Sequence, residues 1–204
     1  KRVLVTAGGT QEALDPVRYL ANHSSGKMGY ALARAAKARG AEVNLISAPT
    51  NLDKPTGVNK TDVNSATEMY QEVFDHYDQQ DIIIMAAAVA DYSFKTVSED
   101  KIKKGDGNLV LELERTPDIL AQLGQEKDTQ TLVGFAAESK NLIENAQDKL
   151  KRKKVDLIVA NNITGEDIGF ASDNNQVVII GSKDQIKVAK TSKLEVANRI
   201  LDQV

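Results

Sequence analysis

The chain of 204 residues contains no cysteine and no tryptophan. Without a thiol it has no disulfide scaffold, no thiolate zinc site and no cysteine nucleophile. Only 4% of its residues are aromatic, so the core must consist mainly of Val, Ile, Leu and Ala. Hydrophobic residues make up 41% and charged residues 27%, which is typical of a globular protein and excludes a disordered one.

The sequence also lacks an excess of either charge, with 26 basic and 29 acidic residues and a net charge of -3. Nucleic-acid-binding proteins are usually far more basic, so we expect no nucleic-acid partner. No apolar run is long enough to cross a bilayer and no signal peptide opens the chain, so we expect no membrane partner and a cytoplasmic location. Because the first residue is Lys1 and not Met, we expect a chain cut from a longer gene product or trimmed at its start.

Apolar runs at residues 3–6, 43–46, 82–88, 132–135 and 155–160 predict buried strands. Helical spacing of apolar residues between these runs predicts helices near 26–39, 65–77 and 141–153. Strands that alternate with helices indicate an α/β fold with a mainly parallel sheet flanked by helices. No repeat or low-complexity linker interrupts the pattern, so residues 1–204 are expected to form a single domain.

Three further patterns predict local structure. Alternation at Leu109, Leu111 and Leu113 predicts a half-buried strand, and residues 177–189 predict a hairpin; both would be antiparallel additions to the sheet. Thr116 and Pro117 are expected to be the N-cap and first residue of a helix. The hairpin would offer an apolar edge, and because exposed edges tend to be covered, we expect it to take part in a two-fold dimer.

Ligands of open α/β sheets bind beyond the carboxyl ends of the strands. The first candidates at this edge are phosphate-binding backbone groups at a glycine turn and a helix start, namely Gly8, Gly9, Ser24, Ser25 and Gly26. The pattern is neither a dinucleotide fingerprint nor a P-loop, and no acidic residue follows the second strand to hold a ribose. The alternative is that these glycines only permit turns and close helix–sheet packing.

Basic residues form the second group of candidates. Lys101, Lys103 and Lys104 are close in sequence, and Lys149 and Lys153 share a helix face at i,i+4 spacing. Such flexible charges suit phosphate groups, although a solvated basic surface is the alternative. The 101–107 segment has little apolar material, so we expect it to be mobile without ligand and to close as a lid.

Asp91 is the third candidate, because it directly follows the apolar run at 82–88. A carboxylate at this position could hold a metal, a ribose or a base amine. The alternative is a solvated loop carboxylate or a cap.

Taken together in this order, the motifs resemble phosphopantothenate–cysteine ligases almost from end to end. The resemblance is carried by the strings at 6–10 (TAGGT), 14–18 (LDPVR), 22–29 (NHSSGKMG), 87–92 (AAVADY), 101–104 (KIKK), 116–119 (TPDI), 134–138 (GFAAE) and 173–175 (DNN). Met85 and Thr116 are mild departures, since relatives can carry a smaller residue and Asn at these positions.

The resemblance implies a Rossmann-like, homodimeric, CTP-dependent and ATP-independent enzyme of coenzyme A biosynthesis that uses Mg²⁺, with ligands that remain unassigned. The carboxylate of 4'-phosphopantothenate would attack the α-phosphate of CTP and release pyrophosphate. The amine of cysteine would then displace CMP from the acyl-cytidylate and form the amide. A flavin-dependent phosphopantothenoylcysteine decarboxylase, fused or separate, is the implied partner.

Site residues follow from the matching positions. Lys101 and Asn22 match the catalytic residues, and Arg18 and Asn22 are implied to bind substrate. The implied nucleotide-binding residues are Met85, Ala86, Ala87, Asp91, Lys101, Thr116, Pro117, Asp118, Ile119, Phe135, Lys149 and Lys153.

Two other functions remain open: an NAD(P)-dependent short-chain oxidoreductase and a nucleotide-binding regulatory module. The missing acidic residue after the second strand and the absence of a Tyr-x-x-x-Lys pair count against the oxidoreductase.

Overall fold

The structure is a computed structural model that describes residues 1–138, 141–162 and 172–204. Its centre is an eight-stranded sheet in the order β12-β11-β10-β9-β6-β1-β4-β5. The parallel strands are β1 (Arg2–Ala7), β4 (Glu42–Ser47), β5 (Asn59–Asp62), β6 (Ile82–Met85), β9 (Thr131–Glu138) and β10 (Leu157–Asn162). The antiparallel β11 (Asn174–Ile180) and β12 (Gln185–Ser192) extend one edge. The predicted α/β class with a mainly parallel sheet and antiparallel additions is confirmed.

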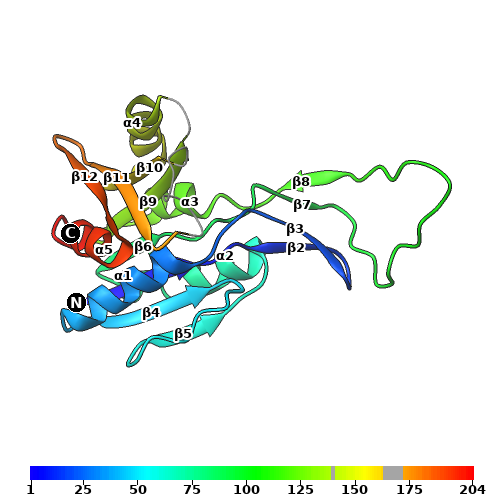
Figure 1. Ribbon diagram of the computed structural model, residues 1–204, viewed down its shortest axis with the longest axis horizontal. Helices are drawn as coiled ribbons and strands as arrows, with labels where there is room; N and C mark the ends of the chain where they lie inside the picture. Colours follow the sequence, from blue (N-terminus) through cyan, green and yellow to red (C-terminus); the bar gives the residue numbers. More distant parts are fainter. Residues whose placement is uncertain (139–140, 163–171) are drawn as a thin grey trace.

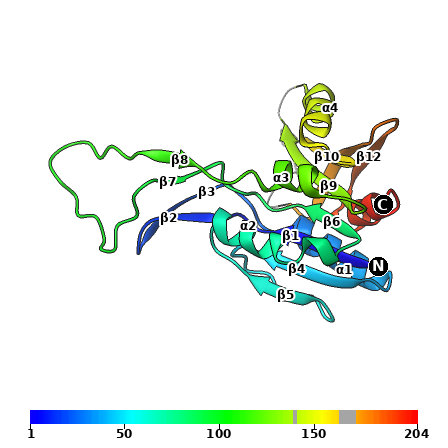
Figure 2. The same cartoon turned by 180° about the vertical axis from the view of Figure 1, so that it is seen from behind.

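Helices cover both faces of the sheet (Figures 1 and 2). One face carries α1 (Lys27–Ala38) and α5 (Lys193–Leu201), and the other carries α2 (Ala66–Phe74), α3 (Ile119–Glu126) and α4 (Leu142–Lys153). A short 3-10 helix, η1 (Tyr77–Gln79), follows α2. Successive residues of one strand point to opposite faces, so Leu4 belongs to one core cluster while Val3 and Val5 belong to the other.

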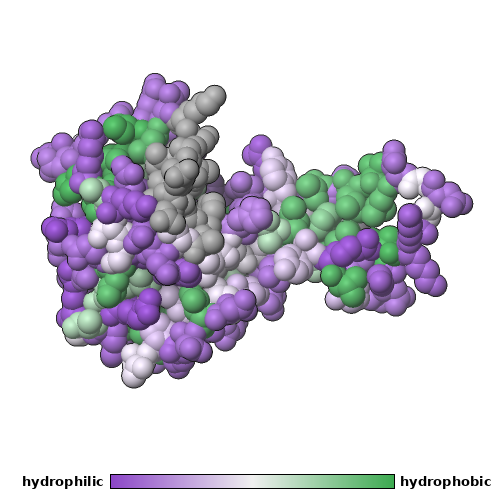
Figure 3. All heavy atoms as spheres, viewed as in Figure 1, coloured by the Kyte–Doolittle hydropathy of each residue, from purple (hydrophilic) through white to green (hydrophobic). Residues whose placement is uncertain are grey.

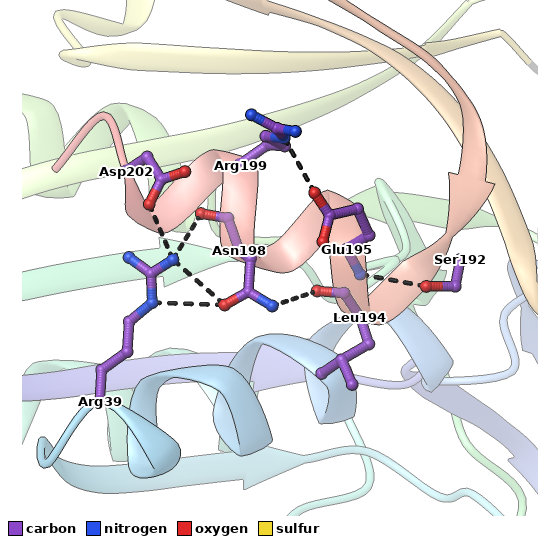
Figure 4. A network of polar contacts seen from close by, with 7 residues as sticks. All are labelled: Arg39, Ser192, Leu194, Glu195, Asn198, Arg199 and Asp202. Carbon is purple, nitrogen blue, oxygen red and sulfur yellow. Dashed lines mark hydrogen bonds and ion pairs between the residues drawn. The ribbon is translucent and has the colours of Figure 1, made fainter.

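Helix α5 is fastened to the end of α1 by Arg39 (Figure 4). The guanidinium donates to the backbone carbonyl of Asn198 at 3.0 Å and to a carboxylate oxygen of Asp202 at 2.8 Å. Ser192 caps the start of α5, because its hydroxyl accepts the amide of Glu195 at 3.2 Å. The two helices therefore pack as one layer.

An arm extends from the body of the molecule (Figures 1 and 2). We define it as residues 11–21 and 92–115. It contains the hairpin β2 (Gln11–Asp15) and β3 (Arg18–Ala21) and the ribbon β7 (Tyr92–Phe94) and β8 (Leu113–Arg115). The sequence did not predict the first hairpin, because every residue of β3 is exposed and leaves no alternating pattern.

Three local predictions are wrong. The strand predicted at 109–113 is not half-buried, since Leu109, Leu111 and Leu113 are 55%, 40% and 44% exposed and only Leu113 lies in a strand. The apolar run after Ile82 ends its strand at Met85. Thr116 is not the N-cap of α3: its hydroxyl donates to the carbonyl of Ala90 at 2.5 Å, and Asp118 caps the helix instead.

The strand β5 was not predicted either, because its short sequence is polar. No helix in the described parts of the chain is long and apolar enough to span a membrane.

Candidate functional site

A cleft of about 1200 Å³ opens beside the ends of β6 and β9. The residues after β6, the β8–α3 connection and one face of α4 form its walls. The lining consists of Met85, Ala87, Val89, Ala90, Asp91, Tyr92, Arg115, Thr116, Pro117, Asp118, Ile119, Leu120, Phe135, Asn145, Asp148, Lys149, Lys151, Arg152 and Lys153. The apolar floor and polar rim suit a ligand with a flat organic part and charged groups.

Cationic side chains outnumber acidic ones around the cleft. The cations are Arg115, Lys149, Lys151, Arg152 and Lys153, and the carboxylates are Asp91, Asp118 and Asp148. Most of the cations come from α4, where i,i+3 and i,i+4 spacing places them together. The arrangement favours an anionic ligand such as a phosphate chain.

Two lysines of α4 are held by groups of the cleft wall. The ammonium of Lys149 donates to the backbone carbonyl of Phe135 at 2.7 Å, and Lys153 forms an ion pair with Asp118. Burial opposes ionisation of Asp118, but the bonds from Lys153 and from the amide of Ala121 hold the pKa of this carboxyl below its usual range. These contacts hold both ammonium groups at the wall of the cleft.

The predicted nucleotide-binding residues meet in this cleft, with two exceptions. Ala86 is half-buried between the lining residues Met85 and Ala87 and packs against the core. Lys101 lies on the arm and does not line the cleft. The resemblance thus selected residues from four separate segments, 85–91, 116–119, 135 and 149–153, that fold to one place, while nucleotide binding by them stays a prediction.

The 86–91 segment is fastened to the end of β1 and to the turn that follows it. The Thr6 hydroxyl accepts the amide of Ala87 at 3.1 Å, and the Thr10 hydroxyl accepts the amide of Ala90 at 2.9 Å. The amide of Ala88 donates to the Gly8 carbonyl at 2.8 Å. This segment therefore fills the switch point between β1 and β6, where an open α/β sheet usually binds its ligand, and the cleft lies one strand further along.

The glycines predicted to cradle phosphate sit at close backbone contacts. A Cβ on Gly8, whose φ is +82°, would lie 2.6 Å from the Ala48 carbonyl oxygen, and one on Gly9 would lie 2.8 Å from that of Asn22. Gly26 is the left-handed N-cap of α1. These contacts support the packing alternative.

Ser24 and Ser25, the two serine candidates, also use their side chains in local bonds to the backbone. The side-chain oxygen of Ser24 accepts the amide of Gly26 at 3.3 Å, and that of Ser25 accepts the amide of Lys27 at 3.4 Å. None of the phosphate-binding candidates lines the cleft, and phosphate binding by them stays a prediction.

Asn22 lies next to the cleft, and its side-chain amide donates to the carbonyl of the lining residue Val89 at 2.9 Å. Arg18 lies on the arm, where it forms an ion pair with Asp15 and donates to the Ile102 carbonyl at 3.0 Å. Arg18 and Lys101 are therefore neighbours on the arm, and the start of the expected lid is tied down rather than free.

The sequence reasoning missed several lining residues, chiefly Arg115, Asn145, Asp148 and Arg152. The three on α4 could have been found, because Asn145 precedes Lys149 by four positions, Arg152 follows it by three, and Asp148 precedes Arg152 by four. Arg115 carries no such signal, since only the ribbon of the arm places it at the rim.

A metal site made of protein groups alone is not found among the described residues, which contain no cluster of three or more His, Asp or Glu side chains. Mg²⁺ usually takes one or two carboxylates together with substrate phosphates. Asp91 and Asp148 fit that requirement at the rim, whereas Asp118 is already engaged by Lys153.

Comparison with known proteins identifies the family. The model of the DNA/pantothenate metabolism flavoprotein C-terminal domain matches residues 1–204. The chain is 49% identical to the coenzyme A biosynthesis bifunctional protein CoaBC of Bacillus subtilis over 208 residues and 45% identical to that of Vibrio cholerae over 204 residues. These alignments cover 100% and 98% of the chain but 51% of either relative, so the chain spans about half their length.

Solved structures agree with this result. A crystal structure of the C-terminal domain of a CoaBC protein superposes with a TM-score of 0.86 at 45% identity and covers 100% of this chain and 93% of that one. The DNA/pantothenate metabolism flavoprotein of Streptococcus pneumoniae gives a TM-score of 0.85 at 25% identity, covering 99% and 97% of the two chains. A Cab2 mutant in complex with phosphopantothenate-cysteine shares the fold, with a TM-score of 0.80 at 19% identity over 100% and 86% of the chains.

Proposed function

The chain belongs to the family of DNA/pantothenate metabolism flavoprotein C-terminal domains, and we propose that it is a phosphopantothenate–cysteine ligase domain of coenzyme A biosynthesis. The observation that carries the proposal is the cationic cleft, into which the fold brings nearly all the residues that match the nucleotide-binding positions of these ligases. The relatives named as coenzyme A biosynthesis proteins support the pathway. Their bifunctional names also support a flavin-dependent decarboxylase as partner, fused or separate.

The proposed reaction has two steps. The carboxylate of 4'-phosphopantothenate attacks the α-phosphate of CTP, so that a carboxyl O–P bond forms, the bond to the β-phosphate oxygen breaks, and pyrophosphate leaves. The amine of cysteine then attacks the acyl carbon of the acyl-cytidylate, the C–O bond to CMP breaks, and the amide forms with loss of the amine proton. The first step builds negative charge on the oxygens of the α-phosphorus. The second builds it on the acyl oxygen and then on the departing CMP oxygen, so fixed cations beside the acyl phosphate lower both barriers.

The cleft residues can be assigned to parts of the nucleotide. Phe135 offers its ring to the cytosine or ribose, and Lys149 and Lys153 offer their ammonium groups to the phosphates. Asp91 or Asp148 would hold Mg²⁺ together with the phosphates of the nucleotide, and the ion would supply positive charge to the triphosphate. Asn22 would donate to the acyl-cytidylate from the neighbouring loop.

In this scheme Lys101 acts in the cleft of a second copy of the chain, because its arm holds it away from the cleft of its own chain. The arm exposes Val97, Leu109, Val110, Leu111 and Leu113, and Val110 is 90% exposed. Figure 3 shows the hydrophobic residues gathered on the arm. A patch of this kind is usually buried against a partner, and an isologous dimer buries the patch of both copies at once.

We therefore propose a two-fold homodimer formed through the arms. This replaces the hairpin expected at the sheet edge, because β11 and β12 turn Val177 and Val188 into the core and expose only Ile186 among their large apolar side chains.

One experiment separates the three candidate functions. Pyrophosphate release is measured with 4'-phosphopantothenate, cysteine and CTP, ATP or GTP, and each component is omitted in turn. The ligase requires all three substrates, releases pyrophosphate and forms the amide. Oxidation of NADPH without nucleotide triphosphate would point to the oxidoreductase, and CTP binding without pyrophosphate release would point to the regulatory module.

A further inference from the structure

The carboxylate of Asp15 is the most heavily bonded acidic group of the arm. It accepts the amides of Val17 and Arg18 at 3.0 and 2.9 Å, the Arg18 guanidinium, and the amide of Ile102 at 3.1 Å. Its side chain is fully buried, although most of the arm is exposed. A buried carboxylate with this many donors stays ionised and holds its neighbours in one geometry.

The polar backbone groups of Ile102 are both held by this pair of residues. Its N–H donates to Asp15, and its carbonyl accepts the Arg18 guanidinium at 3.0 Å. A third bond upstream, from the amide of Ser98 to the Leu14 carbonyl at 3.0 Å, fastens the same strand of chain to the hairpin. The peptide unit that joins Lys101 to Ile102 is therefore fixed to β2, although it lies in no strand.

Residues 103–109 are exposed and lie in no helix or strand. The anchor thus lies immediately next to Lys101 and not elsewhere in the basic segment. An anchored backbone reduces the conformational freedom that a flexible lysine must lose when it reaches its target.

We propose that Asp15 is a positioning residue, which holds the Lys101–Ile102 peptide so that the ammonium of Lys101 is presented to the α-phosphate in the proposed ligase reaction. The catalytic half of this inference rests on the proposed function. The anchoring half does not, because it concerns only the backbone of the arm. Arg18 acts with Asp15 as the second half of the anchor.

The anchor is tested by limited proteolysis with trypsin, followed by mass spectrometry of the fragments. Cleavage after Lys101 breaks the peptide whose N–H is bonded to Asp15, whereas cleavage after Lys103 or Lys104 does not. In Asp15→Asn the rate of cleavage after Lys101, relative to that after Lys103, should rise at least about tenfold, since a bond to a charged acceptor is lost. An unchanged ratio would overturn the anchor.

Asp81→Asn is the matched control, because Asp81 also accepts a backbone amide, that of Arg2 at 2.6 Å, far from the arm. Its cleavage ratio should equal that of the wild type. If Asp15→Asn does not fold, Arg18→Gln removes the bond to the Ile102 carbonyl and leaves the backbone donors of Asp15 in place. It should raise the same ratio, and failure to do so would also overturn the anchor.

The positioning role is tested with a double-mutant cycle on ligase turnover. Asp15→Asn should lower kcat by about ten- to a hundredfold with little change in the KM for CTP, and Asp15→Asn combined with Lys101→Gln should be no slower than Lys101→Gln alone. Independent, multiplicative losses would overturn the inference. If the wild type has no ligase activity, the proposed function and the positioning role both fail, while the tryptic ratio still decides the anchor.

Discussion

Lys153 at the end of α4 forms an ion pair with Asp118, the N-cap of α3, and so joins two walls of the cleft. The side chain of Lys153 is 14% exposed, whereas that of Asp118 is 55% exposed. A cation that is already neutralised attracts phosphate less than a free one. Lys149 donates to the backbone carbonyl of Phe135 at 2.7 Å, on the same wall of the cleft.

The pair makes stability depend on pH in a defined direction. The folded pKa of Asp118 lies below its ordinary value of 3.8, so its contribution to stability is complete well above that pH and is lost as the pH falls through the folded pKa. Asp118→Asn keeps an N-cap oxygen but loses the charge. We expect the free energy of unfolding to fall by about 0.5–1 kcal/mol at pH 7, since the carboxylate is largely solvated, and by less at pH 3. Urea unfolding at both values checks this; a loss independent of pH would contradict it.

Gly124 determines how closely α3 approaches α4. A Cβ at this position would lie 1.8 Å from the backbone oxygen of Lys153. Gly to Ala inside a helix usually stabilises it by about 1 kcal/mol, but here the clash should reverse the sign and cost about 1–3 kcal/mol. Gly105→Ala is the control, since nothing lies within 4 Å of its added Cβ. Denaturant unfolding measures the free energy of unfolding of both variants. Equal values would show that the two helices can move apart freely.

Lys149→Gln should act on nucleotide binding. The lysine lines the cleft in the resting structure, so it is expected to hold phosphates in ground and transition states alike. The KM for CTP should rise about tenfold with kcat nearly unchanged, as steady-state kinetics at saturating cysteine would show. A fall in kcat without a change in KM would assign Lys149 to the chemical step instead.

Lys101→Gln, unlike Lys149→Gln, should mainly lower kcat. A preorganised charge that contacts the reacting phosphate mainly in the transition state contributes roughly 3–4 kcal/mol, so turnover should fall by about two to three powers of ten with a smaller change in CTP affinity. Single-turnover assays of pyrophosphate release measure the first step directly. Near-normal turnover would mean that the basic segment is only a solvated loop.

Val110→Asp tests the dimer. Val110 is 90% exposed, so a carboxylate there leaves the fold of one chain intact but places two like charges near the proposed interface. We expect the wild type to sediment as a dimer at micromolar concentration and Val110→Asp as a monomer with reduced activity. Leu194→Asp, a 46% exposed position on α5, is the control and should remain dimeric. A monomeric wild type would contradict the proposal.

The sequence predicted the body of the fold because strands buried on both faces leave unbroken apolar runs, such as Ile82–Met85. It failed on the arm, where β3 is exposed throughout and two of the three buried residues of β2, Glu12 and Asp15, are acidic. It also failed at Thr116, whose cap-like pattern was overridden by a tertiary bond to the Ala90 carbonyl. Local preference is weak against such contacts.

The candidate site was predicted in a different way. Periodicity found the i,i+4 pair Lys149 and Lys153, but only the resemblance connected it with Phe135 and the loop after β6. No local pattern shows that Lys101 sits on an arm, since that depends on the bonds from Asp15 and Arg18 to one backbone unit, Ile102.

The packing of α5 on α1, fastened by Arg39, has a consequence for the order of events during synthesis. Helix α1 is complete once residue 38 has been made, but α5, which packs on it, is complete only at Leu201. Until then Leu32 and its neighbours on α1 lack part of their apolar surroundings, so this face of the helix stays exposed to solvent. Contacts this distant in sequence slow folding and expose apolar surface meanwhile. The growing chain is therefore expected to need a chaperone more than the finished domain does.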